Sequence, residues 1–196
     1  MKPRADAPPE FCVRNTPFGP ITILWSVHKG QPKICRIVLT GPGKPFKEPP
    51  KRSFTVSRTA PRPEINTVLD QIEAFLHGED VQFSLDIMRL DLCTGFQWKV
   101  LLADHAIPRG RVSTYQLIAK HLKHENGARA VGSALAANPF PPVIPCHRVV
   151  RSAGSLGGYQ GGLKMKRALL EMEGIPLHDT GQVATGDFFY REEASV

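Results

Sequence analysis

Cys146, His147 and Arg148 follow one another in a run, 138–150, that is rich in proline and apolar residues. The thiolate is the nucleophilic form of cysteine, and a neighbouring imidazole or guanidinium group favours it. The prolines in the run stiffen the chain that carries the sulfur atom. These residue types predict a nucleophilic cysteine at position 146.

A glycine-rich loop follows at 154–162, with five glycines around Tyr159 and Gln160. Glycine backbone allows a flat ligand to approach closely. The loop lacks the GxxxxGK[ST] pattern of a phosphate-binding loop, so a nucleoside triphosphate site is disfavoured. The loop is therefore a second candidate for ligand contact.

Positive charge is concentrated around these two features. The stretch 97–178 holds eleven Lys and Arg against four Asp and Glu, which accounts for the net charge of +7 of the whole chain. This distribution indicates either a polyanionic partner or a solubilising surface, and charge alone does not choose between them.

The elements that carry these residues are predicted to be mostly helical. A helix is expected from Gly95, a turn at 107–110, a helix at 115–122 capped by Ser113 or Thr114, and a helix at 128–137. A further helix is expected at 163–173. Two short helices joined by a tight turn form a helix-turn-helix candidate. The small residues of 128–137 suit close packing against a neighbouring helix, or close approach to a nucleic-acid groove.

The first half of the chain predicts a small α/β unit without evident chemistry. Its strands are expected at 20–27, 34–39 and 81–85, with a hairpin joining the first two. A helix is expected from Pro63 to Gly78. Residues 1–15 are expected to be loose, and 41–50 to form a loop.

These elements predict the α+β fold class, with domains at 1–92 and 93–178 and a tail at 179–196. No apolar run reaches transmembrane length and the N-terminus lacks a signal-peptide core, so an intracellular protein is expected. The four cysteines are widely spaced without a CxxC pair, which favours reduced thiols.

The motifs stand in an order that resembles the O6-alkylguanine-DNA alkyltransferases, also called methylated-DNA–protein-cysteine methyltransferases. The resemblance covers about 96–176 and is carried by six segments: Ile107-Pro108-Arg109-Gly110 with Ser113-Thr114-Tyr115, Ala128-Arg129-Ala130-Val131-Gly132, Asn138-Pro139, Ile144-Pro145-Cys146-His147-Arg148-Val149-Val150, Gly157-Gly158-Tyr159, and Glu171-Met172-Glu173-Gly174. It implies an RNase H-like N-terminal domain followed by a winged helix-turn-helix-like domain.

The resemblance implies DNA repair by direct damage reversal. Cys146 would accept an alkyl group from O6-alkylguanine, or from O4-alkylthymine, once per molecule. His147 would be the base, linked through water because adjacent residues of an extended segment point apart. Glu173 would orient His147, Tyr115 would rotate the target nucleotide and protonate the leaving base, and Asn138 would brace the turn before the cysteine.

The family resemblance also implies a partner, double-stranded DNA bound through the minor groove. Arg129 would fill the space left by the flipped base. The remaining DNA-binding candidates are Ser113, Thr114, Ala128, Gly132 and Ser152, and the candidates for the base pocket are Val149, Gly157, Tyr159, Gln160 and Gly161.

No cofactor, no metal and no membrane partner are expected, and the protein is expected to be a monomer of the cytoplasm and nucleoid, or of the nucleus in a eukaryote. Some relatives carry a structural zinc ion in the N-terminal half. Cys12, His28, Cys35 and His77 are candidates for such a site, but they lack a compact ligand pair.

Three other classes of function compete with this interpretation. A non-catalytic binder of alkylated DNA would lack the reactive cysteine. A winged-helix regulator would explain the helices and the charge, but not the Pro145-Cys146-His147-Arg148 run. A cysteine hydrolase would need an oxyanion-hole signature, which the sequence does not show.

Overall fold

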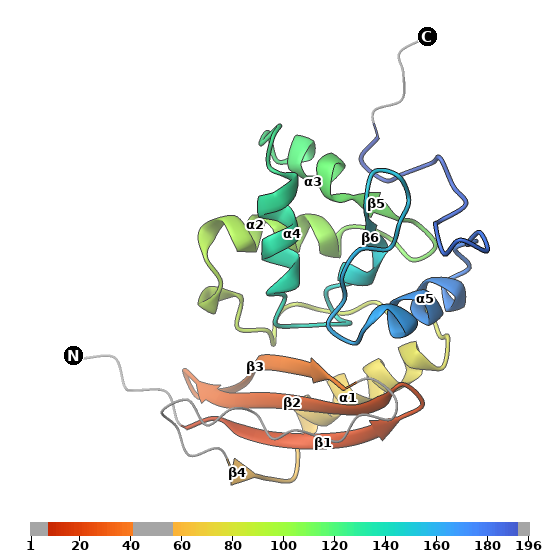
Figure 1. Ribbon diagram of the computed structural model, residues 1–196. Coiled ribbons are helices and arrows are strands. Elements are labelled where there is room, and N and C mark those ends of the chain that lie inside the picture. The colour runs from red at the N-terminus through yellow and green to blue at the C-terminus, as the bar shows by residue number, and fades with distance from the viewer. Residues whose placement is uncertain (1–7, 41–56, 192–196) are drawn as a thin grey trace. The chain divides into compact units, whose positions relative to one another are not determined.

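The structure is a computed structural model that describes residues 8–40 and 57–191. Backbone contacts divide the chain between Leu92 and Cys93 into two compact units, each of which is described separately. The architecture is mixed α/β (Figure 1). The loop predicted at 41–50 lies outside the described residues.

The first unit is built on a four-stranded sheet in the order β3-β2-β1-β4. The strands β1 (Glu10–Thr16), β2 (Gly19–His28) and β3 (Gln31–Leu39) are antiparallel neighbours, and β4 (Ser57–Arg58) runs parallel to β1. The predicted hairpin is confirmed. Its turn residues Lys29 and Gly30 both have positive φ, at 50° and 81°, as a two-residue hairpin turn requires.

The expectation of a loose segment at 1–15 is wrong from Glu10 onward, because β1 pairs with β2 over its whole length. Only Phe11 and Cys12 of this strand are buried, so the apolar signal in the sequence is short. The strand predicted at 81–85 is also wrong. This stretch has no ladder partner, and Phe83 instead packs its ring edge against Phe75, with the centroids 5.8 Å apart.

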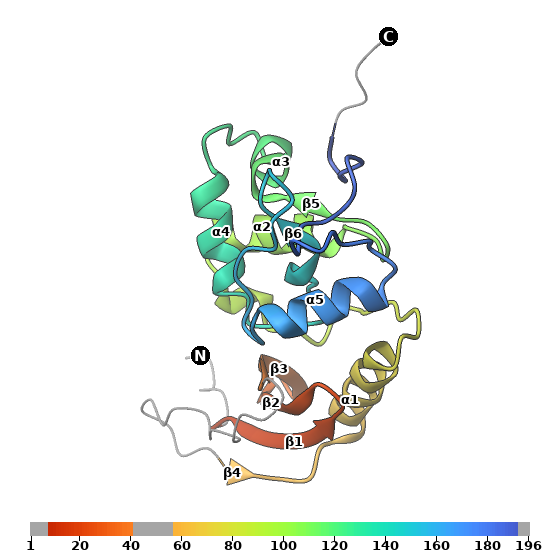
Figure 2. The same ribbon diagram turned by 45° about the vertical axis from the view of Figure 1, so that its right-hand side comes forward.

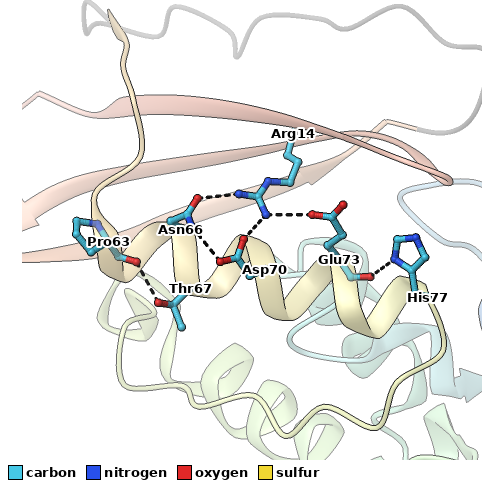
Figure 3. A network of polar contacts seen from close by, with 7 residues as sticks. All are labelled: Arg14, Pro63, Asn66, Thr67, Asp70, Glu73 and His77. Atoms are coloured by element: carbon cyan, nitrogen blue, oxygen red, sulfur yellow. Dashed lines mark hydrogen bonds and ion pairs between the residues drawn. The ribbon is translucent and has the colours of Figure 1, made fainter.

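The helix α1 (Pro63–Leu76) buries the stripe Ile65, Val68, Leu69, Ile72, Phe75 and Leu76. Its polar side is tied to the sheet by Arg14 of β1 (Figure 3). The Arg14 guanidinium donates to Asn66 at 2.7 Å and pairs with Asp70 and Glu73. A short 3₁₀ turn, η1 (Leu90–Leu92), ends the unit.

Three helices form one side of the second unit. The helices α2 (Gly95–His105), α3 (Tyr115–His121) and α4 (Ala128–Ala136) pack against one another (Figures 1 and 2). The Oγ1 atoms of Thr94 and Thr114 cap α2 and α3 by accepting hydrogen bonds from Gln97 N and Leu117 N. The predicted pair of short helices is therefore present.

The rest of the second unit holds the cysteine segment. The short strands β5 (Ser113–Thr114) and β6 (Val149–Val150) pair in parallel, and the 3₁₀ turn η2 (Cys146–Arg148) leads into β6. The helix α5 (Leu163–Met172) packs against η2. The nucleophile candidate thus lies where a turn, a strand pair and a helix converge.

The predicted tail at 179–196 is wrong for its described part, which packs onto the second unit. Val183 and Phe188 join a core cluster with Val112, Val150 and Leu170. Phe189 N donates to the carbonyl oxygen of Val112 at 2.8 Å. The burial of Phe188 explains the difference, because this segment has too few apolar residues in a regular period to be recognised as an element.

Over residues 8–40 and 57–191, the structure contains no helix that is both long enough and apolar enough to cross a membrane.

Candidate active site

Cys146 lies in a 3₁₀ turn, and this corrects the extended geometry assumed from the sequence. Cys146, His147 and Arg148 form η2, which begins after Pro145 and ends at Val149. The argument that adjacent side chains point apart, which holds for a strand, therefore does not apply to Cys146 and His147. The His147 side chain is fully buried beside the thiol segment.

Asn138 connects the end of α4 to the cysteine. Its Nδ2 donates to the carbonyl oxygen of Ile144 at 2.9 Å and to Cys146 Sγ at 3.3 Å, while its Oδ1 accepts from Phe140 N at 2.9 Å. This one amide group braces the turn and supplies a hydrogen bond that stabilises negative charge on the sulfur atom.

His147 and Glu173 form a buried pair at the C-terminal end of α5. His147 Nε2 lies 2.8 Å from Glu173 Oε1, and neither side chain is exposed. Burial opposes ionisation of Glu173, but His147 and Arg148 outweigh it and hold the pKa of this carboxyl group well below its usual range. An ionised Glu173 accepts the Nε2 hydrogen, so the Nδ1 atom of neutral His147 carries the lone pair.

Arg148 completes this network instead of activating the thiol. Its Nε and Nη2 atoms donate to the two Glu173 oxygens at 2.8 and 2.9 Å, and its Nη1 atom donates to Ile107 O at 2.6 Å. A bidentate guanidinium–carboxylate pair is strong and geometrically specific. Arg148 therefore fixes the carboxylate that orients His147.

The surroundings of Cys146 disfavour the thiolate, whereas the sequence led us to expect that its two neighbours favour it. Burial is the largest effect, and together with the nearby Asp104 carboxyl group it raises the pKa of Cys146 to about 12. Asn138 and Lys166 act in the opposite direction.

Lys166 and Asp104 are two buried ionisable residues near the thiol that the sequence interpretation missed. Lys166 Nζ donates to the carbonyl oxygen of Val149 at 2.6 Å, and burial lowers the pKa of this ammonium group to about 8. Asp104 is fully buried on α2, and both its carboxyl oxygens lack a hydrogen-bond partner among the described residues. Burial raises the pKa of Asp104 to about 8. In the sequence, both residues could have been recognised as charged residues on the apolar face of a predicted helix.

A cavity of about 290 Å³ opens above Cys146. Its walls come from α3, α4, the turn before the cysteine, and the glycine-rich loop. The lining residues are Tyr115, Gly132, Leu135, Ala136, Asn138, Pro141, Cys146, Gly158, Tyr159 and Gln160. The structure thus brings together residues that lie up to 45 positions apart in the chain, from Tyr115 to Gln160.

Tyr115 lies between α4 and the glycine-rich loop. A Cβ atom on Gly132 would lie 3.8 Å from its ring, and a Cβ atom on Gly157 would lie 2.8 Å from its hydroxyl oxygen. Gly157 also has φ +68°, so only glycine suits this position. Burial and the nearby Cys146 raise the pKa of the Tyr115 hydroxyl group, so this group stays protonated at neutral pH.

The other predicted pocket residues have different positions. Tyr159 lines the cavity and packs edge-on against His147, with the ring centroids 6.2 Å apart. Val149, Gly157 and Gly161 are not among the lining residues. The carbonyl group of Val149 accepts from Lys166, and Gly161 lies against Met165, where a Cβ atom would be 2.1 Å from Sδ.

The predicted DNA-binding residues divide into an exposed and a buried set. Arg129 and Ser152 are exposed, and Ala128 at the start of α4 is half-buried. Ser113 is buried and its Oγ atom donates to Phe189 O at 2.7 Å, while Thr114 is buried as the cap of α3. The hydroxyl groups of the buried pair are therefore used within the unit.

Among the described residues, no group of three or more His, Cys, Asp or Glu side chains is arranged to hold a metal ion. Cys12 Sγ contacts the Ile23 carbonyl oxygen at 4.0 Å, and Cys35 Sγ lies 3.4 Å from Ser26 Oγ.

Comparison with known proteins identifies the family. Residues 95–175 match the family model "6-O-methylguanine DNA methyltransferase, DNA binding domain". The chain is 46% identical over 119 residues to the methylated-DNA–protein-cysteine methyltransferase of Methanothermobacter thermautotrophicus, covering 61% of this chain and 66% of that protein. The Mycobacterium bovis methyltransferase of the same name is 39% identical over 127 residues, covering 63% of this chain and 75% of that protein.

A solved structure agrees. The Mycobacterium tuberculosis OGT in complex with DNA has a TM-score of 0.67 and 31% identity to this chain, and the match covers 84% of this chain and 92% of the OGT chain. The chain therefore belongs to the methylated-DNA–protein-cysteine methyltransferase family.

Proposed function

We propose that this protein repairs DNA by moving an alkyl group from the O6 atom of guanine to Cys146, once per molecule. The observation that carries the proposal is the position of Cys146 at the base of a cavity, with its sulfur atom bound by Asn138. The buried His147–Glu173 pair beside it supplies a base. Family membership supports the same activity.

The reaction begins with removal of the thiol proton. Nδ1 of His147 accepts it through one water molecule, Glu173 stabilises the resulting imidazolium, and Arg148 holds the Glu173 carboxylate in position. Lys166 and Asn138 stabilise the thiolate. Because burial otherwise disfavours the thiolate, the nucleophilic form of Cys146 is produced only when this proton is removed.

Sγ of Cys146 then displaces the purine from the alkyl carbon. A carbon–sulfur bond forms, the bond between that carbon and O6 breaks, and the electron pair stays on the guanine. The purine takes up a proton, for which the hydroxyl group of Tyr115 is the donor. The thioether is stable, so the protein is consumed.

DNA binding is assigned to α3 and α4 of a winged helix-turn-helix-like unit. The exposed, small-residue face of α4 suits the minor groove, and Arg129 fills the gap left by the flipped nucleotide. Ser152, Ala128 and Gly132 adjoin the DNA, and Tyr159 and Gln160, which line the cavity, contact the base. Ser113 and Thr114 support this surface from within.

The same proposal includes an RNase H-like first unit, a monomeric protein, and a location with the DNA in the cytoplasm and nucleoid or in the nucleus. A non-catalytic binder of alkylated DNA is the principal alternative. The presence of Cys146 with its hydrogen-bonded neighbours favours the enzyme.

The test uses duplex DNA that carries a labelled O6-methylguanine. We expect one methyl group on the peptide that contains Cys146, at a stoichiometry of one per protein, and none in Cys146→Ala, which still binds the DNA. Intact binding without transfer by the wild-type protein would establish the non-catalytic binder instead.

Arg129→Ala tests the flipping role. We expect repair of duplex DNA to slow at least tenfold, while transfer from the free base O6-benzylguanine stays unchanged, because only the duplex must be opened. Single-turnover rates on both substrates measure this. Equal losses on the two substrates would contradict the role.

A further inference from the structure

A groove of about 800 Å³ lies between α3 and the C-terminal segment of the second unit, apart from the active-site cavity. It is lined by Leu117, Lys120, His121, Lys123, Tyr190 and Arg191, and we call it the α3 groove. None of these residues lines the cavity above Cys146. The groove is therefore a separate feature of the surface.

The α3 groove carries uncompensated positive charge. Lys120, Lys123 and Arg191 are exposed, and the lining contains no acidic residue. In the portion of the chain that the structure describes, none of these three cations forms an ion pair, whereas Arg111 and Arg167 nearby in the same unit each do. A group of cations without acidic partners among the described residues favours an anionic ligand.

Two of the lining residues of the groove form an aromatic pair. The rings of His121 and Tyr190 stack with centroids 4.0 Å apart and an interplanar angle of 25°. The Tyr190 hydroxyl group donates to the carbonyl oxygen of Ala103 at 2.9 Å. Tyr190 has φ +67°, an uncommon conformation for this residue, which the contacts on both sides hold. The part of this groove that suits the backbone of nucleic acid is therefore its set of cations, and the aromatic pair shapes the surface between them.

The geometry of α3 explains how one helix serves two sites. Leu117, Lys120 and His121 are spaced by three and four residues, so they share one face. Tyr115, which lines the active-site cavity, precedes this face at the start of the helix. The helix thus presents one end to the alkylated base and another face to the groove.

We propose that the α3 groove binds the phosphodiester backbone of duplex DNA, as a contact additional to the one that serves base flipping. Phosphate contacts supply affinity without sequence information, which suits a repair protein that must search undamaged DNA. The inference rests on the proposed function, which it deepens by adding a second DNA contact.

The test is the double variant Lys120→Ala/Lys123→Ala in the full chain, where both side chains are exposed. The dissociation constant for undamaged duplex DNA is measured at several salt concentrations. Each lost phosphate contact lowers the slope of log K against log salt by about 0.9. We expect the slope to fall by about 2, with about tenfold weaker binding at low salt. The charge reversal Lys120→Glu/Lys123→Glu should weaken binding further.

A matched control removes two exposed charges elsewhere, in Lys99→Ala/Arg36→Ala. We expect a smaller change in slope for this control. An equal loss in the control, or an unchanged slope in the groove variant, would overturn the proposal. Glu192 and Glu193 follow Arg191 in the sequence and lie outside the described residues. All variants retain them, so that their negative charge is the same in every protein compared.

Two further measurements separate the outcomes. Transfer from O6-benzylguanine should be unchanged in the groove variant, because this substrate carries no phosphate. If the wild-type protein bound DNA but transferred no alkyl group, the proposed activity would fail while the groove test stood. The affinities of the wild type and the groove variant are also compared on a duplex of about 12 base pairs and on one of about 40. If the groove holds the flank of the same duplex, the variant should lose affinity only for the longer DNA. Titration to stoichiometry shows whether the groove instead holds a second DNA molecule.

Discussion

Arg148 lies two residues after Cys146, yet its guanidinium group is used to hold Glu173 and the carbonyl group of Ile107. The neighbour in sequence is thus a positioning residue, and the groups that act on the sulfur atom are Asn138 and Lys166. Adjacency identifies a reactive cysteine, but it does not say which side chain stabilises its charge. At this scale the consequences are protonation states, and they can be measured.

Cys146 should react slowly with soluble electrophiles. Burial raises the pKa of its thiol to about 12, so little thiolate exists at pH 7.4. With iodoacetamide, we expect the Cys146 peptide to be labelled at least tenfold more slowly in the folded protein than in the same protein unfolded by urea. Mass spectrometry of the digested protein measures both rates. Equal rates would show that the resting protein already holds a thiolate.

Asp104→Asn should remove a pH-dependent cost to stability. In the folded protein burial raises the pKa of this carboxyl group from 3.8 to about 8, so between these values the folded state keeps a proton that the unfolded state releases. The free energy of unfolding therefore falls as pH rises through this window, by up to about 1.4 kcal/mol per pH unit from this group.

Asn cannot titrate, so the variant should gain stability relative to wild type from pH 5 to pH 8. Urea unfolding of both proteins at each pH gives the difference. Taking the difference also cancels the opposite contribution of His147, whose pKa is lowered by burial. A difference that does not change with pH would mean that Asp104 is ionised throughout.

The elements differ in how far local sequence specifies them. α1 and α5 have regular apolar stripes, and α3 has a threonine cap, so their positions follow from periodicity and capping. β1 and the segment after residue 178 do not, because their few apolar residues gain meaning only from partners far along the chain. β1 is defined by pairing with β2, and the C-terminal segment by the pocket between Val112 and Leu170 that Phe188 enters.

Phe188→Ala tests whether the C-terminal segment is part of the core of the second unit. Phe188 is 6% exposed, and removal of a buried phenylalanine ring costs about 3 kcal/mol. We expect a loss of this size in urea unfolding. The control Asp187→Ala removes an exposed ion pair with Arg111 and should cost less than about 1 kcal/mol. A neutral Phe188→Ala would restore the interpretation of a loose tail.

At the scale of the whole molecule, positive charge is most concentrated in the segment that carries Cys146. The net charge of +7 arises entirely within 97–178, which lies in the unit that carries Cys146. The first unit presents a sheet, a helix and the Arg14 network, and residues 1–92 carry a net charge of +3, which the net charge of −3 over residues 179–196 offsets. The sequence alone revealed this asymmetry because charge can be counted without a structure.

Binding to duplex DNA should therefore depend steeply on salt. We expect the affinity for undamaged duplex to fall by at least about tenfold between 50 and 200 mM salt, because bound phosphates release counterions. Transfer from O6-benzylguanine should change little over the same range, since this substrate is uncharged. Fluorescence anisotropy and single-turnover rates measure the two quantities. A salt-independent affinity would contradict a phosphate-bound complex.

From the sequence alone the family, the nucleophile candidate and the ordered set of motifs could be predicted, because these depend on residue types and short spacings along the chain. It also placed most helices of the second unit, because capping and periodicity act locally. Only the tertiary structure showed that burial raises the pKa of Cys146, that Arg148 binds Glu173, and that Lys166 and Asp104 lie buried near the thiol. The physical reason is that burial and Coulomb interactions depend on which groups meet in space, and those groups come from α2, α4, η2 and α5 together.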